Sequence, residues 1–438
     1  MYYHRIVAGA LLAFTHTAFS SGFALHEQNA SGLGEFYAGA GAIAEEASTN
    51  YYNPAGLVLL PGTQISISGV NVMSAFTFEG DTEYQTGIGA PYPPTALYSA
   101  EGSTAAGTSR LVPAVHISHR FTDQIAAGFS VTAPFGLATE YSDESIARYQ
   151  AIESDMYTLN IGPSLAFRVL PWLSLAAGFD AQYAELKVSS AVNYAFGYEP
   201  SPETDNISKN HATSWAWGWH AAAMAIISPQ SHVGLNYRSN FEHDFSGNSR
   251  FKDADGNLIT DSHVSGTADF PWLVDLSGSH AFNDKWTVLG SVAYTNWSSI
   301  SALTLDNVAT SIAGHNATGT STDPLNYENS WSAFAGLRYQ YNPYVMFKVG
   351  GGYDQSPTQD EDRDLRLPDS NRWIASAGIR VIPPQVKNLS LDLAYARIFA
   401  NDAPIEKSLE DETTVTNTAD GTVTGHADLI GAQISLRI

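Results

Sequence analysis

The sequence predicts an all-β fold, a 14-stranded antiparallel transmembrane β-barrel with a partly helical N-terminal hatch (plug) inside its lumen. Apolar and polar residues alternate with a period of two along most of the chain after residue 62. Short and long connections alternate between these segments. The first residues also have the layout of an export signal. Short turns at one end, long loops at the other and an even number of strands are typical of outer-membrane barrels.

Composition limits the possible classes of protein. The 438 residues carry 21 Lys and Arg against 44 Asp and Glu, a formal net charge of −23, and 15% of residues are charged. This acidity argues against nucleic acid as a partner, because its binding requires a basic surface. The absence of Cys excludes a disulfide scaffold, cysteine-ligated zinc and a thiol nucleophile. Low charge with 12% aromatic residues fits either a large soluble β-protein or a barrel that faces lipid.

Residues 1–20 are predicted to be a signal peptide. Arg5 is followed by an apolar run from Ile6 to Phe14 and then by the small residues Ala18 and Ser20, which places cleavage after Ser20. A transmembrane helix is the alternative, but spanning requires about 20 apolar residues. We therefore expect export to the outer membrane of a Gram-negative bacterium, with both termini of the mature chain in the periplasm.

Residues 21–62 do not alternate and are predicted to form the hatch. They are rich in Gly and Ala, with aromatic residues such as Phe36, Tyr51 and Tyr52 interspersed. A flexible linker would not need those aromatic side chains. A compact plug of small residues fits better, since a 14-stranded barrel is wide enough to require filling.

Residues 63–438 are predicted to form the barrel with long extracellular loops. Near the C-terminus, for example, Ile430, Ala432, Ile434 and Leu436 alternate with more polar neighbours. Tight turns are expected at 121–123, 170–172, 228–230, 282–285, 341–343 and 382–385. Long loops are expected at 79–108, 143–154, 193–211, 249–261, 306–324, 358–368 and 404–423. These thirteen connections, 6 + 7, imply fourteen strands.

Aromatic residues are placed as a membrane protein would place them. Trp215, Trp217 and Trp219 occur at spacing two and project from one face of one strand. A stacked core cluster is the alternative, but their position beside a long polar loop favours an interfacial aromatic girdle. The same placement is predicted for Tyr183, Trp286, Tyr294, Trp297, Tyr339 and Trp373.

An ordered set of motifs covers nearly the whole mature chain. In the hatch these are Ser21–Gln28, Ser31–Gly34, Ala38–Ala44 and Asn53–Ala55, and in the barrel Phe135–Glu140, Trp217–Trp219, Tyr237–Ser239, Ala293–Ser298, Asp354–Pro357 and Leu367–Asp369. Together they closely resemble the FadL family of outer-membrane transporters of long-chain fatty acids and other hydrophobic compounds. One departure is the terminal Ile438, where such barrels usually end in an aromatic residue.

The resemblance implies a transport route. Capture at the extracellular loops would be followed by passage past the hatch, where Phe23 matches the family's N-terminal Phe, and by lateral exit through a kinked third strand. The match to that kink is Ala133 to Gly136, and the hatch motif Asn53, Pro54 and Ala55 is implied to lie against it. Independently, Pro134 lacks an N–H for the ladder and Gly136 is nearby, which predicts a bulge or a strand that ends early.

Ligand-binding candidates are Phe23, Leu25 and Phe135 together with four cations. Alternation places Arg338, Lys348 and Arg380 on inner faces, where each could meet a ligand carboxylate or pair with a neighbouring acidic residue. Lys187 matches a cation of fatty-acid transporters by motif, although a strict period of two would turn it outward.

Other readings stay open. The expected substrates are long-chain fatty acids, with monoaromatic hydrocarbons as the alternative, and no residue pattern separates them.

A barrel hydrolase is disfavoured because Gly-x-Ser-x-Gly is absent, and a general diffusion porin gives no reason for an aromatic-rich plug. No cofactor or metal is expected, since His116 and His119 point to opposite faces and Asp253–Asn257 is an incomplete calcium loop. The expected partners are hydrophobic small molecules, outer-membrane lipid and lipopolysaccharide, with a monomeric barrel.

Overall fold

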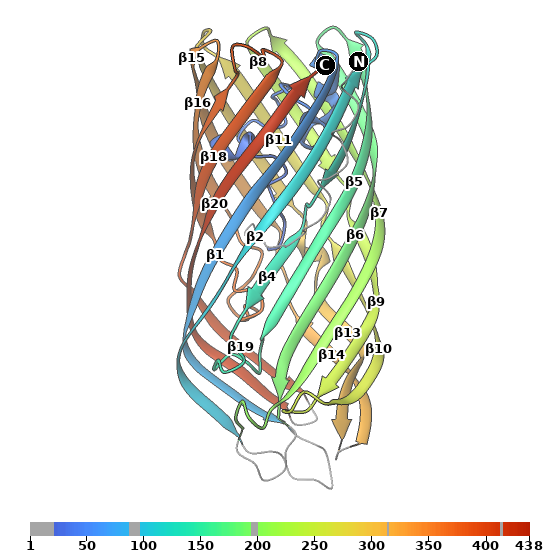
Figure 1. The fold of residues 1–438 in the computed structure, drawn as a ribbon, viewed down its shortest axis with the longest axis vertical. Helices are drawn as coiled ribbons and strands as arrows, with labels where there is room; N and C mark the ends of the chain where they lie inside the picture. The colour runs from blue at the N-terminus through green and yellow to red at the C-terminus, as the bar shows by residue number, and fades with distance from the viewer. Residues whose placement is uncertain (1–21, 87–96, 194–199, 313–314, 412–414) are drawn as a thin grey trace.

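A computed structural model describes residues 22–86, 97–193, 200–312, 315–411 and 415–438 of the chain. It is a tall closed barrel whose strands tilt steeply around the axis (Figure 1). The signal peptide predicted over residues 1–20 lies outside the described residues. No helix in the described part of the chain is both long enough and apolar enough to cross a membrane.

The barrel wall is one antiparallel sheet that closes on itself. Twenty strand segments form the sheet, and β1 pairs with β20 over its full length, from Gln64↔Arg437 to Thr86↔Val415. Closure pairs the backbone groups that an open sheet would leave exposed to lipid. Six crossings of the wall are built from two consecutive segments, so 20 − 6 gives fourteen wall strands, as predicted.

The fourteen wall strands follow chain order. They are β1 (Thr63–Thr86), β2 (Tyr98–Arg120), β3 and β4 (Ile125–Thr132, Gly136–Glu140), β5 (Glu153–Leu170), β6 (Leu173–Val192), β7 (Asn206–Ser228), β8 and β9 (Ser231–Arg238, Phe241–Lys252), β10 and β11 (Leu258–Phe270, Leu273–Ala281), β12 and β13 (Trp286–Thr295, Ala302–Ile312), β14 and β15 (His315–Pro324, Ser330–Asn342), β16 (Val345–Asp354), β17 (Arg372–Val381), β18 and β19 (Leu389–Ala400, Ala403–Asp411) and β20 (Val415–Arg437).

The predicted tight turns are present, but several predicted loops are extended strand instead. Residues expected in the loop at 79–108 belong largely to the paired strands β1 and β2, and those at 306–324 form the β13–β14 hairpin. The β19–β20 hairpin replaces much of the loop at 404–423. Polar Gly-, Ser- and Thr-rich composition does not distinguish a loop from a water-exposed hairpin, since both present polar side chains to solvent.

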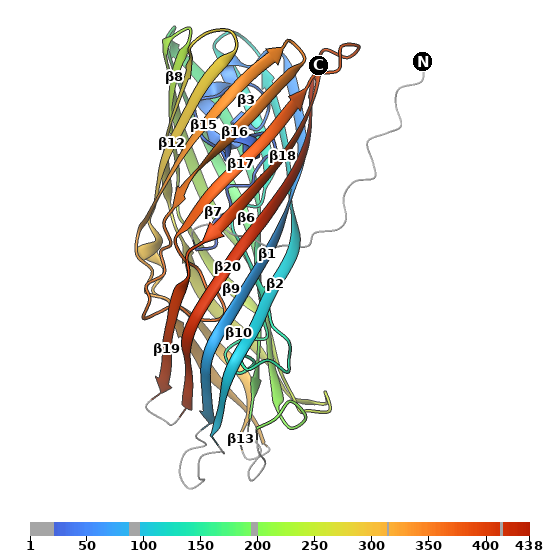
Figure 2. The same ribbon diagram turned by 90° about the vertical axis from the view of Figure 1, so that its left-hand side faces the viewer.

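The segment before β1 lies inside the barrel, near the end that carries the short turns (Figure 2). It contains two 3₁₀ helices, η1 (Gly32–Glu35) and η2 (Pro54–Leu59), and the short helix α1 (Thr49–Tyr52). A further 3₁₀ turn, η3 (Trp297–Ser299), lies in the wall between β12 and β13. In outer-membrane barrels the short turns face the periplasm, so this hatch closes the periplasmic half of the lumen.

Small side chains let the hatch approach the wall closely. A Cβ atom placed on Gly350 of β16 would lie 2.3 Å from the carbonyl oxygen of Glu35, and one on Gly234 of β8 would lie 1.8 Å from that of Gly41. Backbone can pack this closely only where a glycine faces it. These wall glycines therefore allow the hatch backbone to pack directly against the barrel.

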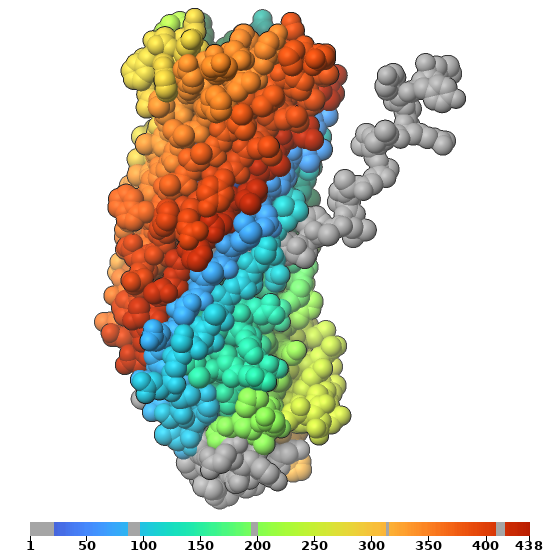
Figure 3. Space-filling view, turned by 60° about the vertical axis from the view of Figure 1, so that its left-hand side comes forward, coloured from blue at the N-terminus to red at the C-terminus, as the bar shows by residue number. Residues whose placement is uncertain are grey.

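The outer face is apolar and carries the aromatic girdle. Trp215, Trp217 and Trp219 are all more than half exposed, which supports the girdle over a core cluster. The prediction for Trp297 is wrong, because its side chain is fully buried in the lumen. Trp297 starts the η3 turn, where the strand is interrupted and the period-two rule no longer assigns a face. Figure 3 shows the steep diagonal course of the C-terminal strands, β1 and β2 over one side of this surface.

Candidate functional site

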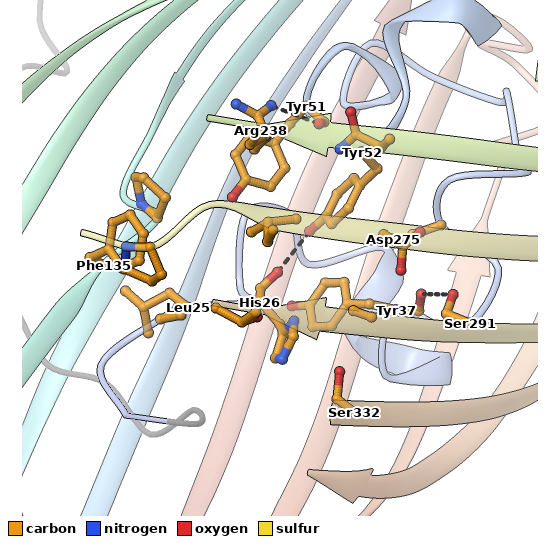
Figure 4. A pocket seen from close by; sticks show the side chains of 18 of the residues that line it. Leu25, His26, Tyr37, Tyr51, Tyr52, Phe135, Arg238, Asp275, Ser291 and Ser332 are labelled. Atoms are coloured by element: carbon orange, nitrogen blue, oxygen red, sulfur yellow. Dashed lines mark hydrogen bonds between the residues drawn. The ribbon is translucent and has the colours of Figure 1, made fainter. Parts of the chain in front are cut away.

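A cavity of about 100 Å³ lies between the hatch and the wall. The hatch lines it with Leu25, His26, Tyr37, Tyr51 and Tyr52, and Figure 4 shows these side chains around it with Phe135 and Arg238 of the wall. A cavity of this order is comparable with the ~150 Å³ site that holds one benzene ring in another protein. The site is therefore of a size to hold a small apolar molecule.

Interruptions of the wall surround this cavity. Pro134, Ser239 and Pro271 line it, and each lies in a break between two segments of one wall strand. Thr295 and Ser330, which also line it, lie at the edges of two further breaks. A proline that cannot donate to the ladder, or an irregular turn, frees wall backbone to bend at this level.

The break at Pro134 is filled by the hatch. The N–H of Leu25 donates to the Pro134 carbonyl and the N–H of Gly136 donates to the Phe23 carbonyl, both at 2.8 Å. Ala24 and Phe135 form an antiparallel bridge between these bonds. Residues 23–25 thus act as a short strand that pairs with the interrupted third wall strand.

Gln28 completes this contact. Its side-chain nitrogen donates to the Ala133 carbonyl and its side-chain oxygen accepts from the Ala133 N–H, each at 2.8 Å. Sequence reasoning missed this residue as a contact of the kink, since a lone Gln in a hatch motif does not reveal a partner 105 residues away.

Beside the break, the wall has no ladder between β2 and β4. In the described chain β2 pairs with β3 only up to Val115↔Val131, while β4 pairs with β5. Side-chain contacts lie here instead: Thr108 Oγ1 of β2 donates to the Ala138 carbonyl of β4 at 3.5 Å, and Arg110 of β2 pairs with Asp155 of β5 at 3.5 Å. Contacts of this kind are easier to separate than a ladder of backbone hydrogen bonds.

Phe23 and Phe135 belong to an aromatic cluster next to the cavity, here called the Phe23 cluster and completed by Phe270 and Trp297. The Phe23 ring centroid lies 4.8 Å from that of Trp297, 5.1 Å from Phe270 and 5.8 Å from Phe135, with edge-to-face geometry. The hatch therefore packs the phenyl ring of Phe23 against three aromatic side chains of the wall. Leu25, also predicted as a ligand contact, is buried and lines the cavity.

The predicted inward cations do face inward, but none of the three lines this cavity. Arg338 donates to Glu35 and Glu45, and Arg380 to Glu45, Asp392 and Ser31. Lys348 contacts Ser31 and Asp392. Three of these partners, Ser31, Glu35 and Glu45, belong to the hatch, so the cations fasten η1 and its neighbourhood to β15, β16 and β17. Glu45 has its pKa lowered to about 2, in spite of burial, by Arg338 and Arg380.

Lys187 and the motif Asn53–Ala55 also lie away from the cavity. Lys187 is half exposed on the outer side of β6, where it pairs with Glu185 at 2.7 Å. Asn53 caps η2 by accepting from the Ala55 N–H, and its amide donates to Gly41 and to Ala223 of β7. The Ala55 carbonyl accepts from Ser174 of β6. The hydrogen bonds of this motif, which Pro54 joins as the first residue of η2, therefore go to β6 and β7 rather than to residues 133–135.

A buried polar network connects the cavity to the wall behind it. Arg238 donates to Asp180 at 3.3 Å and to the Tyr51 carbonyl at 2.7 Å. Asp180 also contacts His220 at 2.6 Å, and the other ring nitrogen of His220 lies 2.8 Å from Ser164 Oγ. This connectivity matches a Ser–His–Asp triad, but none of these three residues lines the cavity. The network holds the Arg238 guanidinium between Asp180 of β6 and the Tyr51 carbonyl of the hatch.

Two neighbouring hatch residues have perturbed ionisation. Burial, assisted by Arg372, lowers the pKa of His26 to about 4, so this cavity-lining ring is neutral at pH 7. Burial raises the pKa of Glu27 to about 8. Neither carboxylate oxygen of Glu27 has a hydrogen-bond partner in the described chain.

These features define a class of protein. A closed antiparallel barrel with an apolar, aromatic-rich outer face, a hatch across its lumen and a small cavity beside a break in the wall is an outer-membrane transport barrel. Residues 11–438 match the family model described as outer membrane protein transport protein (OMPP1/FadL/TodX). The chain belongs to this family of outer-membrane transporters of hydrophobic compounds.

Relatives and solved structures agree with this membership. Outer membrane protein P1 of Haemophilus influenzae is 28% identical, with 98% of each chain covered. A long-chain fatty acid transport protein of Escherichia coli O6:H1 is 28% identical over 85% of this chain and 86% of its own. A FadL homologue of Pseudomonas aeruginosa superposes with a TM-score of 0.82 at 22% identity, covering 95% and 99% of the two chains. The toluene transporter TbuX of Ralstonia pickettii gives 0.65 at 17% identity, covering 94% and 98%. At these identities the last two likenesses concern the fold.

Proposed function

We propose that the protein takes up neutral hydrophobic compounds through a lateral route. A molecule captured at the extracellular loops would reach the cavity beside the hatch and leave through the wall between β2 and β4. The observation that carries the proposal is the ladder-free interval at Pro134, closed by residues 23–25 of the hatch and adjoining the cavity. Lateral exit suits such cargo, because burying apolar surface is favourable by about 25 cal/mol per Å² and water on the periplasmic side would oppose release.

Two substrate classes follow from the names of similar proteins: long-chain fatty acids and monoaromatic hydrocarbons. The sequence favours fatty acids by family resemblance. The site geometry favours a neutral, ring-containing molecule. Arg238 is the one Lys or Arg among the cavity-lining residues, and it is already paired with Asp180. The Phe23 cluster shows that an aromatic ring packs well next to the cavity.

Uptake by cells tests this proposal. Cells with and without the protein are given labelled toluene and labelled oleate, and we expect protein-dependent uptake of toluene. A variant that combines Pro134→Val and Gly136→Val restores an N–H and strand propensity at the break. We expect it to lower uptake severalfold, because a continuous third strand narrows the exit.

The matched control is Pro163→Val, which changes an exposed proline of β5 that lies opposite Phe129 of β3 and does not line the cavity. It should leave uptake unchanged. Heat-modifiable mobility on gels verifies that each variant assembles. Normal uptake by the assembled double variant would refute the lateral route, while uptake of oleate alone would assign the fatty acid class.

A further inference from the structure

The cavity has polar atoms on one wall that lack partners, and most of them are hydrogen-bond acceptors. Asn160 and Asn236 line the cavity at 2% and 4% exposure. The side-chain oxygen of each has no hydrogen-bond partner in the part of the chain that the structure describes. A buried acceptor without a donor destabilises the fold, so these two oxygens require an explanation.

The two amides are held in one cluster. Asn160 donates its side-chain N–H to Asp180 Oδ1 at 2.7 Å, and Arg238 donates to the same oxygen at 3.3 Å. Asn236 lies two residues before Arg238 on the same face of β8 and directly opposite Asp275 of β11. Because the Asn160 side-chain nitrogen donates to Asp180, the orientation of the amide is fixed and its oxygen remains available as an acceptor.

Charge in the cavity disfavours an anion. The ionised residues that line it are Arg238, Asp275 and Asp354, a formal sum of 1 − 2 = −1, with His26 neutral. Asp275 accepts from Ser277 Oγ at 2.6 Å, and Figure 4 shows its carboxylate among the side chains that surround the cavity. Arg238 Nε is a buried donor without a partner in the described chain. Arg238 is paired with Asp180 and Asp354 with Arg372, whereas Asp275 has no ion pair among the described residues, so a ligand carboxylate would meet the like charge of Asp275.

The remaining wall is aromatic. Tyr37, Tyr51, Tyr52, Phe135, Phe241 and Phe334 line the cavity. We propose that this cavity binds a neutral aromatic compound that carries a hydroxyl group, with the ring against these side chains and the O–H donated to Asn236 or Asn160. The inference rests on the proposed function and narrows its substrate class. A site with a buried group that needs a hydrogen bond rejects analogues that cannot make it.

Matched probes test the hydroxyl. We would measure equilibrium binding of 4-ethylphenol, 4-ethyltoluene, 4-ethylanisole and 4-ethylbenzoate to the purified barrel in amphipol, with binding to amphipol alone subtracted. All four share the ring and the ethyl group. The first three are neutral, and only the phenol donates a hydrogen bond. One net hydrogen bond corresponds to roughly 3- to 10-fold in affinity. We therefore expect the phenol to bind that much more tightly than the toluene and the anisole, and the benzoate to bind least.

Variants assign the acceptor. Asn236→Leu, similar in volume, should bring the phenol-to-toluene affinity ratio close to one. Asn236→Asp, which keeps an acceptor, should preserve the ratio. Asn71→Leu makes the same change on β1, away from the cavity lining, and serves as the control. If Asn236→Leu does not assemble, Asn160→Leu provides the same comparison.

The inference is overturned if the anisole equals the phenol, if the benzoate binds best, or if neither Leu variant changes the ratio. Failure of the proposed function gives a different result, since cells would then show no protein-dependent uptake of 4-ethyltoluene. Uptake of 4-ethyltoluene without a phenol preference would retain transport and remove the hydroxyl site.

Discussion

Glu27 lies in an environment that disfavours its charge. It is 1% exposed in the hatch, and its carboxylate oxygens lack hydrogen-bond partners in the described chain. Burial raises its pKa to about 8, so the folded hatch holds a proton that an unfolded chain would release near pH 4.5. Stability that depends on this group is fully present below pH 4.5 and is lost as pH rises through about 8.

We expect Glu27→Gln to remove this pH dependence. At pH 4.5 the variant and the wild type should show equal hydrogen-exchange protection of the hatch over residues 22–30. At pH 9 the wild type should exchange faster, because it has to bury a carboxylate, whereas the neutral amide has no such cost. Comparing both proteins at each pH cancels the intrinsic pH dependence of exchange. Equal protection at both pH values would show that Glu27 finds a partner on ionisation.

At the scale of elements, η1 is fastened to the wall by charge. Arg338 of β15 bonds to Glu35 and Glu45 of the hatch, and the Arg338 and Glu35 side chains are almost fully buried. Removing one partner of a buried ion pair leaves an uncompensated charge and typically costs 3–5 kcal/mol. Lys348 and Arg380 remain near these glutamates and moderate the loss.

Arg338→Ala is therefore expected to destabilise hatch docking by about 3 kcal/mol. The measurement is hydrogen exchange of residues 32–46, with ion conductance in planar bilayers as a second readout of a loosened hatch. Arg397→Ala is the control, since Arg397 pairs with Asp428 on the outer face of the wall and forms no ion pair with the hatch among the described residues. Unchanged exchange in Arg338→Ala would mean that the remaining cations hold η1 alone.

The sequence predicts turns and breaks that depend on the chemistry of a single residue. It does not predict contacts that depend on residues far away in the chain. Tight turns at Pro171, Pro229 and Pro343 and the break at Pro134 follow from a residue that cannot donate to a ladder. The partner of Arg338 could not be predicted, because Glu35 and Glu45 lie about 300 residues earlier in the chain. The alternation of residues predicted that these cations point inward. It could not predict whether an inward cation binds a ligand or the hatch.

At the scale of the whole molecule, the outer wall is an apolar surface bounded by aromatic side chains. Along β12, for example, the outward residues run from Trp286 through Val288 and Val292 to Tyr294. Val349 on the neighbouring part of the wall is half exposed between Phe347 and Tyr353 on β16. A position between two aromatic ends lies in the hydrocarbon region of the bilayer.

Val349→Arg should destabilise the folded barrel by about 2–4 kcal/mol in lipid, because a charge would be placed in hydrocarbon. Val386→Arg, in the exposed connection between β17 and β18, should have a small effect. Denaturant titration of both variants in bilayers measures the difference. Equal effects at the two positions would contradict the assignment of Val349 to the lipid-facing band.

The number of wall strands could be predicted because each crossing repeats the same pattern. The cavity could not, because its lining comes from the irregular residues between segments, such as Ser239 and Pro271, where alternation stops. Trp297 is buried for the same reason. Pattern-based reasoning thus describes the regular wall and loses accuracy at the interruptions that form the site.

The bridge between Ala24 and Phe135 would couple withdrawal of the hatch tip to opening of the barrel wall. Since the Leu25 and Gly136 amides are bonded across it, the hatch tip cannot withdraw without uncovering the side of the barrel. The same residues, 23–25, belong to the hatch and close the break in the third wall strand. In the proposed route, a molecule that moved residues 23–25 would therefore also open the break at Pro134.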